Sequence, residues 1–312
     1  MSNIGQECLS DYAYHLVVED RGDNLSIYQK RFIKVIDYID ANLDKPIDVD
    51  ALCAVVHLSK YHFHRQCSGV FGLPVMTIIK LLKLKRAAYQ LAYRVDDKLI
   101  DIAFNCGYES HEAFSRAFKK VFLVTPSAFR QAPNWHVWQS NYDPIEKLRT
   151  NLMLDKAKFD VQIVHFDQVL TATLEHRSSP NNLGQSIAKF IAWRKQNKLP
   201  PSKSRTFNLL YDDPNQTPPD EYRFGLCCAV NEPIEDQEHG IASKVIPAGR
   251  CAKIRFVGSD DAIGVAVNYL YGQWLAENEH QLRDFPIFFE RVSFFPEVAE
   301  HEMITDIYLP IE

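Results

Sequence analysis

The chain has 312 residues, 46% of them hydrophobic, which is enough for about two domains with buried cores. The net charge of −5 excludes little by itself, but its distribution is informative. Residues 26–133 carry 16 Lys and Arg against 10 Asp and Glu, net +6, whereas residues 159–312 carry 14 against 22, net −8. A basic half suits contact with phosphates, while an acidic half would repel DNA and suits another partner.

No apolar run reaches the length of a membrane helix, and the N-terminus lacks the basic start and apolar core of a signal peptide. We therefore expect a cytoplasmic protein with no membrane partner. The seven cysteines show no CxxC pairing and no disulfide framework, so we expect them to be reduced and mostly buried. Residues 1–25 have no clear periodicity and are interpreted as an N-terminal extension without an assigned function.

Helices are predicted through the first half. Apolar residues at helical spacing predict a helix from Tyr28 to Leu43, a short helix from Asp48, and another from Ser59 to Phe71 that ends at Gly72. A long basic helix follows from Val75 to Arg94. At 1.5 Å per residue it spans roughly 25 to 30 Å, enough to hold two helices about one turn of DNA apart.

The pattern then repeats. A short helix through Leu99, Ile102 and Ala103 ends at Gly107, and a second helix begins after Ser110 and stops before Thr125-Pro126. Four residues of the first unit recur 51 positions later, so the chain contains two copies of one helical unit. The pairs are Ser59 and Ser110, Phe63 and Phe114, Arg65 and Arg116, and Phe71 and Phe122.

Residues 26–132 resemble the tandem helix-turn-helix DNA-binding domain of AraC-type transcription regulators. The resemblance rests on Ile102-Ala103 followed by Gly107-Tyr108, on the run Phe114–Lys120, and on the closing run Thr125–Arg130. It implies an all-α tandem helix-turn-helix domain that binds double-stranded promoter DNA. The DNA-reading residues it implies are Tyr61, His64, Arg65, His111, Glu112, Ser115 and Arg116.

Two positions depart from the family pattern: Cys67 replaces a core Phe, and Leu123 replaces a Gly, which predicts a different cap for the last helix. Arg65 and Arg116 could instead be solvated surface charges, because exposed arginines are common. Their matched positions in the two units argue against this alternative. An Arg fork can bind guanine or clamp a phosphate. Glu112 fits the set least well, because phosphates repel a carboxylate unless it accepts from a cytosine amine.

Cysteine and histidine cluster within the first unit, which raises the question of a metal site. The cluster fits no zinc spacing, its cysteines fall at core positions, and two of its histidines point to different sides of their helix. We interpret these residues as packing and surface residues and expect neither a metal nor another cofactor. They are Cys53, His57, His62, His64 and Cys67.

The pattern loosens over residues 133–158, which are interpreted as a linker with a short helix from Ile145 to Lys156. Strands follow over 159–177, then a helix from Leu183 to Asn197 and strands over 206–211 and 222–230. The same order returns as a strand over 242–258, a helix over 260–278 and strands over 286–295 and 303–311. With Trp193 and Trp274 set 81 residues apart, this predicts an α+β domain of two strand-helix-strand-strand modules.

Residues 159–312 resemble a GyrI-like effector-binding domain, which implies a small-molecule effector. The matching runs are Tyr211–Pro214, Ile246–Gly249, Phe289-Glu290 and Thr305–Pro310. The family's Gly-x-Tyr after the first strand of each module is replaced here by Pro180-Asn181-Asn182 and Gly258-Ser259-Asp260.

Strand alternation over 286–295 places Phe288, Glu290, Val292 and Phe294 on one face. The sequence leaves open a buried pair between Glu290 and an arginine. The resemblance implies instead that Glu290 accepts a lipophilic cation, for which aromatic faces and one carboxylate are suited. Trp274 and Tyr271 are candidate walls of such a pocket, the alternative being core packing.

The sequence thus predicts a multidomain, non-enzymatic transcription regulator that binds promoter DNA and senses a small molecule. RNA polymerase is a further candidate partner. One alternative is a GyrI-like hydrolase fused to a DNA-binding domain, although no Ser-His-Asp, Cys-His or metal motif supports it. The other is a ligand-free protein-interaction module, which a groove filled by side chains around Glu290 would favour.

Overall fold

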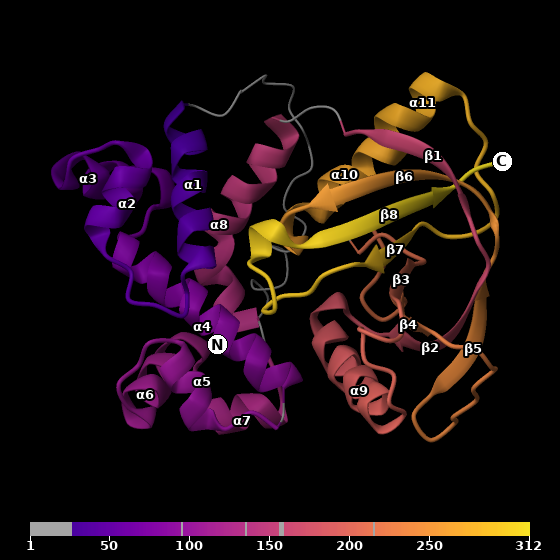
Figure 1. Cartoon of the computed structure of the whole chain (residues 1–312), viewed down its shortest axis with the longest axis horizontal. Coiled ribbons are helices and arrows are strands. Elements are labelled where there is room, and N and C mark those ends of the chain that lie inside the picture. The colour runs from indigo at the N-terminus through magenta and orange to yellow at the C-terminus, as the bar shows by residue number, and fades with distance from the viewer. Residues whose placement is uncertain (1–26, 95, 135, 156–158, 215) are drawn as a thin grey trace, which may run out of the picture.

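The computed structural model describes residues 27–312 apart from residues 95, 135, 156–158 and 215. A helical half is followed by a half built on one β-sheet, which confirms the predicted fold class (Figure 1). The extension predicted for residues 1–25 lies outside the described residues.

The helices of the first half begin and end within about two residues of the predicted positions, because capping signals in the sequence define them locally. The hydroxyl oxygens of Ser59 and Ser110 accept hydrogen bonds from the backbone N–H groups of His62 and Ala113 at the starts of the two expected reading helices. The bounds are α1 Ile27–Ala41, α2 Val49–Val56, α3 Lys60–Phe71, α4 Val75–Tyr93, α5 Leu99–Asn105, α6 His111–Phe122 and α7 Pro126–Gln131.

Each helical unit packs its aromatic residues on the core side and leaves its second helix partly exposed. Phe32 stacks on Phe63 in the first unit, with ring centroids 5.8 Å apart, and Phe118 stacks on Phe122 in the second at 4.3 Å. Cys53 and Cys67 are buried in the same core, which confirms the core positions expected for them.

The cap after α6 differs from our expectation. Leu123 adopts the left-handed conformation, with φ of 61°, and its backbone N–H bonds to the carbonyl of Lys119. The cap is therefore of the same kind as the one that Gly72 forms after α3. The expectation of a different cap was wrong, because helix geometry imposes the left-handed turn even on a side chain that is disfavoured there.

The segment interpreted as a linker contains a helix longer than expected, α8 His136–Asp155, which includes Pro144. The turn formers in its first half are overridden by tertiary packing, since Tyr142, Ile145 and Leu148 are buried in the core of the helical half. α8 contacts α1 on one side and the β-sheet half on the other (Figure 1).

The second half is an eight-stranded antiparallel sheet in the order β1-β6-β8-β7-β3-β4-β2-β5. This order is symmetric about its centre, and each half of the sheet contains one strand-helix-strand-strand module, as the internal duplication predicted. The strands are β1 Val161–Phe166, β2 Val169–Arg177, β3 Thr206–Leu210, β4 Arg223–Ala229, β5 Ile241–Ile246, β6 Gly249–Val257, β7 Phe288–Arg291 and β8 Ile304–Pro310.

The helices of the two modules follow β2 and β6. The first module has a 3-10 turn η1 Pro180–Asn182 and α9 Leu183–Gln196. The second has η2 Asp260–Ala262, α10 Ile263–Tyr269, a π-helical turn η3 Leu270–Trp274 and α11 Leu275–Asn278, so the single helix expected over 260–278 is divided by changes of helical pitch. A last 3-10 turn, η4 Glu300–Glu302, precedes β8.

β7 is shorter than the strand predicted over 286–295. The backbone N–H groups of Val292 and Ser293 both bond to the carbonyl of Ile304, at 3.0 and 3.2 Å, so two residues oppose one and the pairing ends. Strict alternation therefore stops after Arg291, and it does not extend to Phe294.

Within the part of the chain that the structure describes, no single helix is both long enough and apolar enough to cross a membrane. Taken together, the bent pair of helices α3 and α4 has the length and composition of a membrane span. However, most apolar residues of these two helices are buried in the core.

Candidate functional site

The two helices predicted to read DNA present their expected residues at or near the surface. Tyr61, His64 and Arg65 are exposed on α3, and the Arg65 guanidinium lies 5.3 Å from the centre of the Tyr61 ring. On α6, Glu112 and Arg116 are exposed, whereas His111 and Ser115 are half-buried, with 3.5 Å between His111 Nε2 and Ser115 Oγ. Each unit thus offers an exposed arginine at an equivalent position.

Glu112 is tied to the start of its helix. Hydrogen bonds from its own backbone N–H and from the Ser110 hydroxyl hold the pKa of this carboxyl below its usual range. A carboxylate near a helix N-terminus stabilises the helix, which gives Glu112 a structural role besides any contact with a base.

Register across the sheet separates two faces. One face carries the apolar residues that pack on α9, α10 and α11, including Phe289 and Ile307. The other, here named the Glu290 face, is defined by two rows of residues that pair from strand to strand. One row is Thr173, Cys227, Phe207, Glu290, Asp306 and Arg255, and the other is Glu175, Gly225, Leu209, Phe288, Tyr308 and Lys253.

Aromatic rings lie beneath the charges of the Glu290 face. Phe288 is parallel to Tyr308, with ring centroids 5.0 Å apart, and both rings meet the Phe166 ring nearly edge-on. These rings are buried, so they fill the space beside Glu290. A hollow of about 260 Å³ lies nearer the β1 edge of this face, lined by Asp160, Gln162, Lys253 and Arg255.

Glu290 is paired with an arginine, the arrangement that the sequence had left open. Arg205 Nε and Nη2 donate to the two carboxylate oxygens at 2.7 and 2.8 Å, and Tyr308 donates to one of them at 3.4 Å. The Arg205 guanidinium also lies 4.9 Å from the centre of the Phe207 ring. Because the Arg205 side chain is 50% exposed, the pair sits at the surface and solvent weakens it.

The other predicted ligand residues do not all gather around Glu290. Phe288 lies in the neighbouring row of the same face. Trp274 is buried in the core on the opposite side of the sheet, where it stacks on His280, and Tyr271 is exposed on the same helical segment. Phe294 lies beyond the end of β7 and is half-buried.

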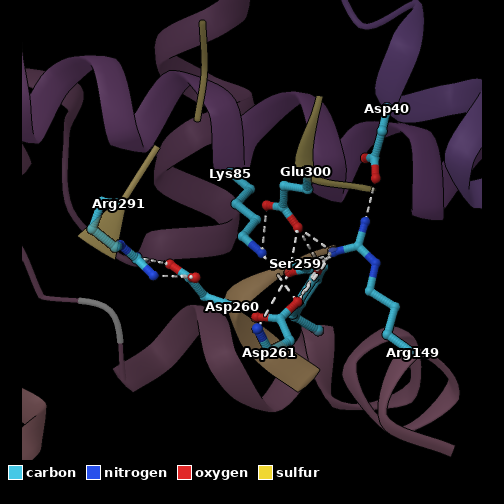
Figure 2. A network of polar contacts seen from close by, with 9 residues as sticks. Asp40, Lys85, Arg149, Ser259, Asp260, Asp261, Arg291 and Glu300 are labelled. Atoms are coloured by element: carbon cyan, nitrogen blue, oxygen red, sulfur yellow. Dashed lines mark hydrogen bonds and ion pairs between the residues drawn. The ribbon is translucent and has the colours of Figure 1, made fainter. Parts of the chain in front are cut away.

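A second polar site lies between the two halves and was not predicted. The interdomain cluster consists of Asp40 on α1, Lys85 on α4, Arg149 on α8, Asp261 on η2 and Glu300 on η4 (Figure 2). Lys85 Nζ lies 2.7 Å from Glu300 and 3.5 Å from Asp261, while Arg149 pairs with Asp40 and Glu300 and lies 3.1 Å from Asp261.

Neutral groups complete the interdomain cluster. The Ser259 hydroxyl donates to Glu300 at 3.0 Å, and the Tyr142 hydroxyl donates to Asp261 at 3.0 Å. Lys85 Nζ also lies 4.0 Å from the centre of the Tyr142 ring. The charges are thus hydrogen-bonded on several sides, as buried ions must be to avoid a large desolvation penalty.

Two cations face three carboxylates in this cluster, and the pKa values of the three carboxyl groups shift in different directions. Burial opposes the ionisation of Asp261 and Glu300, but Lys85 and Arg149 outweigh it and hold both pKa values below the usual range. Burial raises the pKa of Asp40 to about 7, against the opposing effect of Arg149. Asp40 is therefore the first of the three carboxyl groups to take up a proton as the pH falls.

The interdomain cluster had one signal in the sequence. Lys85 falls within the apolar stripe of α4, between the buried Leu82 and Ala88, where a lysine requires a partner. The partner could not be read from the sequence, because Asp261 and Glu300 lie 176 and 215 residues further along the chain. The partner of Glu290, 85 residues away, was out of reach for the same reason.

For the hydrolase alternative, the serine–histidine contact to consider is the one between His176 and Ser186 in the β-sheet half. His176 Nδ1 lies 2.8 Å from Ser186 Oγ. The partner of Nε2 on the same ring is the backbone oxygen of Ser179, at 3.2 Å, where a catalytic triad would have a carboxylate. His176 is buried, and its two contacts join β2 to α9 and the turn before it. This geometry is that of a structural bridge.

Two families match the chain, one in each half. Residues 159–312 match the family described as a GyrI-like small molecule binding domain, and residues 52–132 match a helix-turn-helix domain family. Together with the relatives below, these matches show that the chain belongs to the AraC-type transcription regulators with a C-terminal GyrI-like domain. It is a DNA-binding transcription regulator with a small-molecule-binding domain.

Among its relatives is the "Probable transcriptional regulator YgiV" of Escherichia coli strain K12, which is 39% identical over 163 residues, 52% of this chain and 99% of that protein. The "Transcriptional regulator Rob" of Salmonella typhimurium strain LT2 is 31% identical over 98 residues, 31% of this chain and 34% of that protein. A solved structure, the EcmrR–DNA complex in EcmrR-RPo, aligns over 86% of this chain and 85% of its own with a TM-score of 0.42 and 15% identity.

Proposed function

We propose that this protein controls transcription in the cytoplasm by binding promoter DNA through α3 and α6 and by sensing a lipophilic cation at the Glu290 face. The observation that carries the DNA part is the pair of N-capped helices, each with an exposed arginine at an equivalent position, in two helix-turn-helix units that α4 connects. RNA polymerase is a proposed further partner, because a regulator bound at a promoter lies beside it.

The cation part rests on the position of Arg205. Its guanidinium makes two hydrogen bonds to Glu290 and lies against the Phe207 ring, which is how a cationic ligand would be bound. Arg205 therefore occupies the place of such a ligand. Because its side chain is half exposed, it can leave toward solvent and give up the carboxylate and the aromatic face to a ligand.

We expect the full chain to bind duplex DNA with strong salt dependence. Its own upstream region and sequences selected from a random duplex library are suitable probes. If about six phosphates are contacted, the logarithm of the binding constant should fall with the logarithm of salt concentration with a slope of about −5. Fluorescence anisotropy over a range of salt concentrations measures this slope. A flat response, or failure to select any sequence, would contradict the DNA-binding role.

We expect lipophilic cations such as tetraphenylphosphonium to raise the melting temperature of the full chain, since a ligand that binds only the folded state stabilises it. Glu290→Gln keeps the side-chain volume and should abolish this shift, while Arg205→Gln removes the internal competitor and should enlarge it. Thermal shift with each variant measures both effects. Glu175→Gln, which alters another paired carboxylate of the same face, is the matched control and should leave the shift intact.

The opposite thermal-shift result for Glu290→Gln and Arg205→Gln would indicate a different class of ligand. If anions and not cations raise the melting temperature, and Arg205→Gln abolishes the effect, the face binds anionic ligands through Arg205. If neither class shifts any variant, the side-chain-filled face favours the protein-interaction module.

A further inference from the structure

Residues 290 and 291 point to opposite faces of the sheet and join the Glu290 face to the domain interface. Arg291 follows Glu290 in β7 and makes two hydrogen bonds to Asp260, of which the one from Nη1 is 2.7 Å long. It also donates to the hydroxyl of Thr305 on β8, at 3.2 Å. Asp260 is thereby attached to the strand that carries the proposed ligand-binding carboxylate.

Asp260 is adjacent in sequence to Asp261, a member of the interdomain cluster. Figure 2 shows the Arg291–Asp260 pair beside the contacts that Asp261 makes with Lys85 and Arg149. Ser259, on the other side of Asp260, donates to Glu300 of the same cluster. The turn 259–261 is thus bound to β7 at its middle residue and to the helical half at its last residue.

On the helical side of the interface lies α4, and one face of this helix contacts the β-sheet half. Lys85 contacts Asp261 and Glu300, and Tyr89, one turn later, meets the Phe295 ring edge-on with centroids 5.0 Å apart. Arg94, just beyond the helix, pairs with Glu297. Because α4 connects the two helix-turn-helix units, a bend in α4, or a shift of α4 against one unit, changes the relative placement of α3 and α6.

We propose that the turn 259–261 transmits the state of the Glu290 face to α4 through the Arg291–Asp260 pair, and so sets the spacing of the two reading helices. This coupling rests on the proposed function. A ligand that displaces Arg205 would alter the position of Glu290, and with it the position of Arg291. When Arg291 moves, either the turn 259–261 moves with it or the Arg291–Asp260 pair breaks.

The interdomain cluster suits such a role because it favours discrete arrangements of the two halves over intermediate ones. Its five charged side chains are largely buried, so small relative movements of the two halves separate charges in a medium that screens them poorly. Packed interfaces of this kind shift between discrete arrangements more readily than they deform continuously. Allosteric coupling needs such a two-state element.

Hydrogen exchange of the full chain tests the coupling without a ligand. The readout is the amide exchange rate of α4 residues 81–93 in four proteins: wild type, Glu290→Gln, Asp260→Asn and the double variant. We expect Glu290→Gln to change exchange in α4 by about 2- to 30-fold, and to have no such effect once Asp260→Asn has removed the pair with Arg291. Arg291→Lys, which keeps the charge and loses the two-pronged contact, should behave as Asp260→Asn does.

Arg255→Lys is the matched control, because Arg255 makes the same two-pronged contact with Asp306 on the Glu290 face and has no contact with the turn. It should leave α4 unchanged. Equal effects of Glu290→Gln with and without Asp260, or no effect of Glu290→Gln at all, would overturn the proposal. These outcomes depend neither on DNA binding nor on a ligand, so failure of the proposed function is detected separately, by the salt titration for DNA binding and by the thermal-shift measurements for cation sensing.

Discussion

Replacing Arg149 by methionine is expected to destabilise the full chain by about 3 to 5 kcal/mol, because the change leaves buried carboxylates without their cation. Arg149 contacts Asp40, Asp261 and Glu300 at once, and Lys85 alone would remain to balance all three. Urea unfolding followed by intrinsic fluorescence measures the loss. Since two domains take part, unfolding of each half should be followed separately, for example by hydrogen exchange.

The loss should depend on pH in a defined direction. In the folded wild type, burial raises the pKa of Asp40 to about 7, above the ordinary value of 3.8 that it regains on unfolding. Between about pH 4 and 7 the folded state therefore holds a proton that the unfolded state releases, and this contribution to stability is lost as pH rises. At pH 6, Asp40 is largely protonated and needs a partner less, so Arg149→Met should cost less there than at pH 8.

Two variants check that charge is the cause. Asp40→Asn in the Arg149→Met background removes one of the stranded carboxylates and should restore part of the stability, which a double-mutant cycle quantifies. Arg94→Met breaks the exposed interdomain pair with Glu297 and should cost about 0 to 1 kcal/mol, because solvent screens such a pair. An equally small cost for Arg149→Met would show that the interdomain cluster is dispensable for stability.

The parts of the fold that the sequence predicted well depend on neighbouring residues. Ser59 and Ser110 mark helix starts within one turn of the residues they cap, and the 51-residue repeat fixes equivalent positions in the two units. Strand alternation likewise placed Phe288 and Glu290 on one face. Helix capping and strand alternation act over two to four residues, so a single sequence contains all the information they need.

What the sequence did not predict depends on distant residues. Turn formers around Pro144 argued against the helix α8, but burial of Tyr142 and Ile145 against the first helices outweighed local preference. The alternation expected up to Phe294 fails because two residues of this strand pair with Ile304. Glu290 was recognised as a functional candidate, whereas its partner Arg205 on another strand was visible only in three dimensions.

The double variant Arg65→Ala with Arg116→Ala is expected to abolish sequence-specific DNA binding by the full chain. Each arginine, if it forms two hydrogen bonds with a guanine, contributes about 1 to 3 kcal/mol of discrimination. The two residues lie on α3 and α6 in different helix-turn-helix units, so their effects should add to about 2 to 6 kcal/mol, or roughly 30-fold to more than 10⁴-fold in affinity. Anisotropy titrations with a selected duplex and a scrambled duplex measure the change.

The pattern of loss distinguishes reading from phosphate contact. An arginine that reads a base should lower affinity for the selected duplex much more than for the scrambled one, and each single variant should relax preference in a different half-site. A phosphate clamp should weaken both duplexes alike and lower the salt slope by about one. Lys34→Ala, which removes an exposed charge from α1 and not from α3 or α6, controls for the loss of positive charge alone. If only one of the two arginines affects the selected duplex, one unit carries the specificity, and the other, held by the same helix α4, contributes affinity or contact with a partner protein.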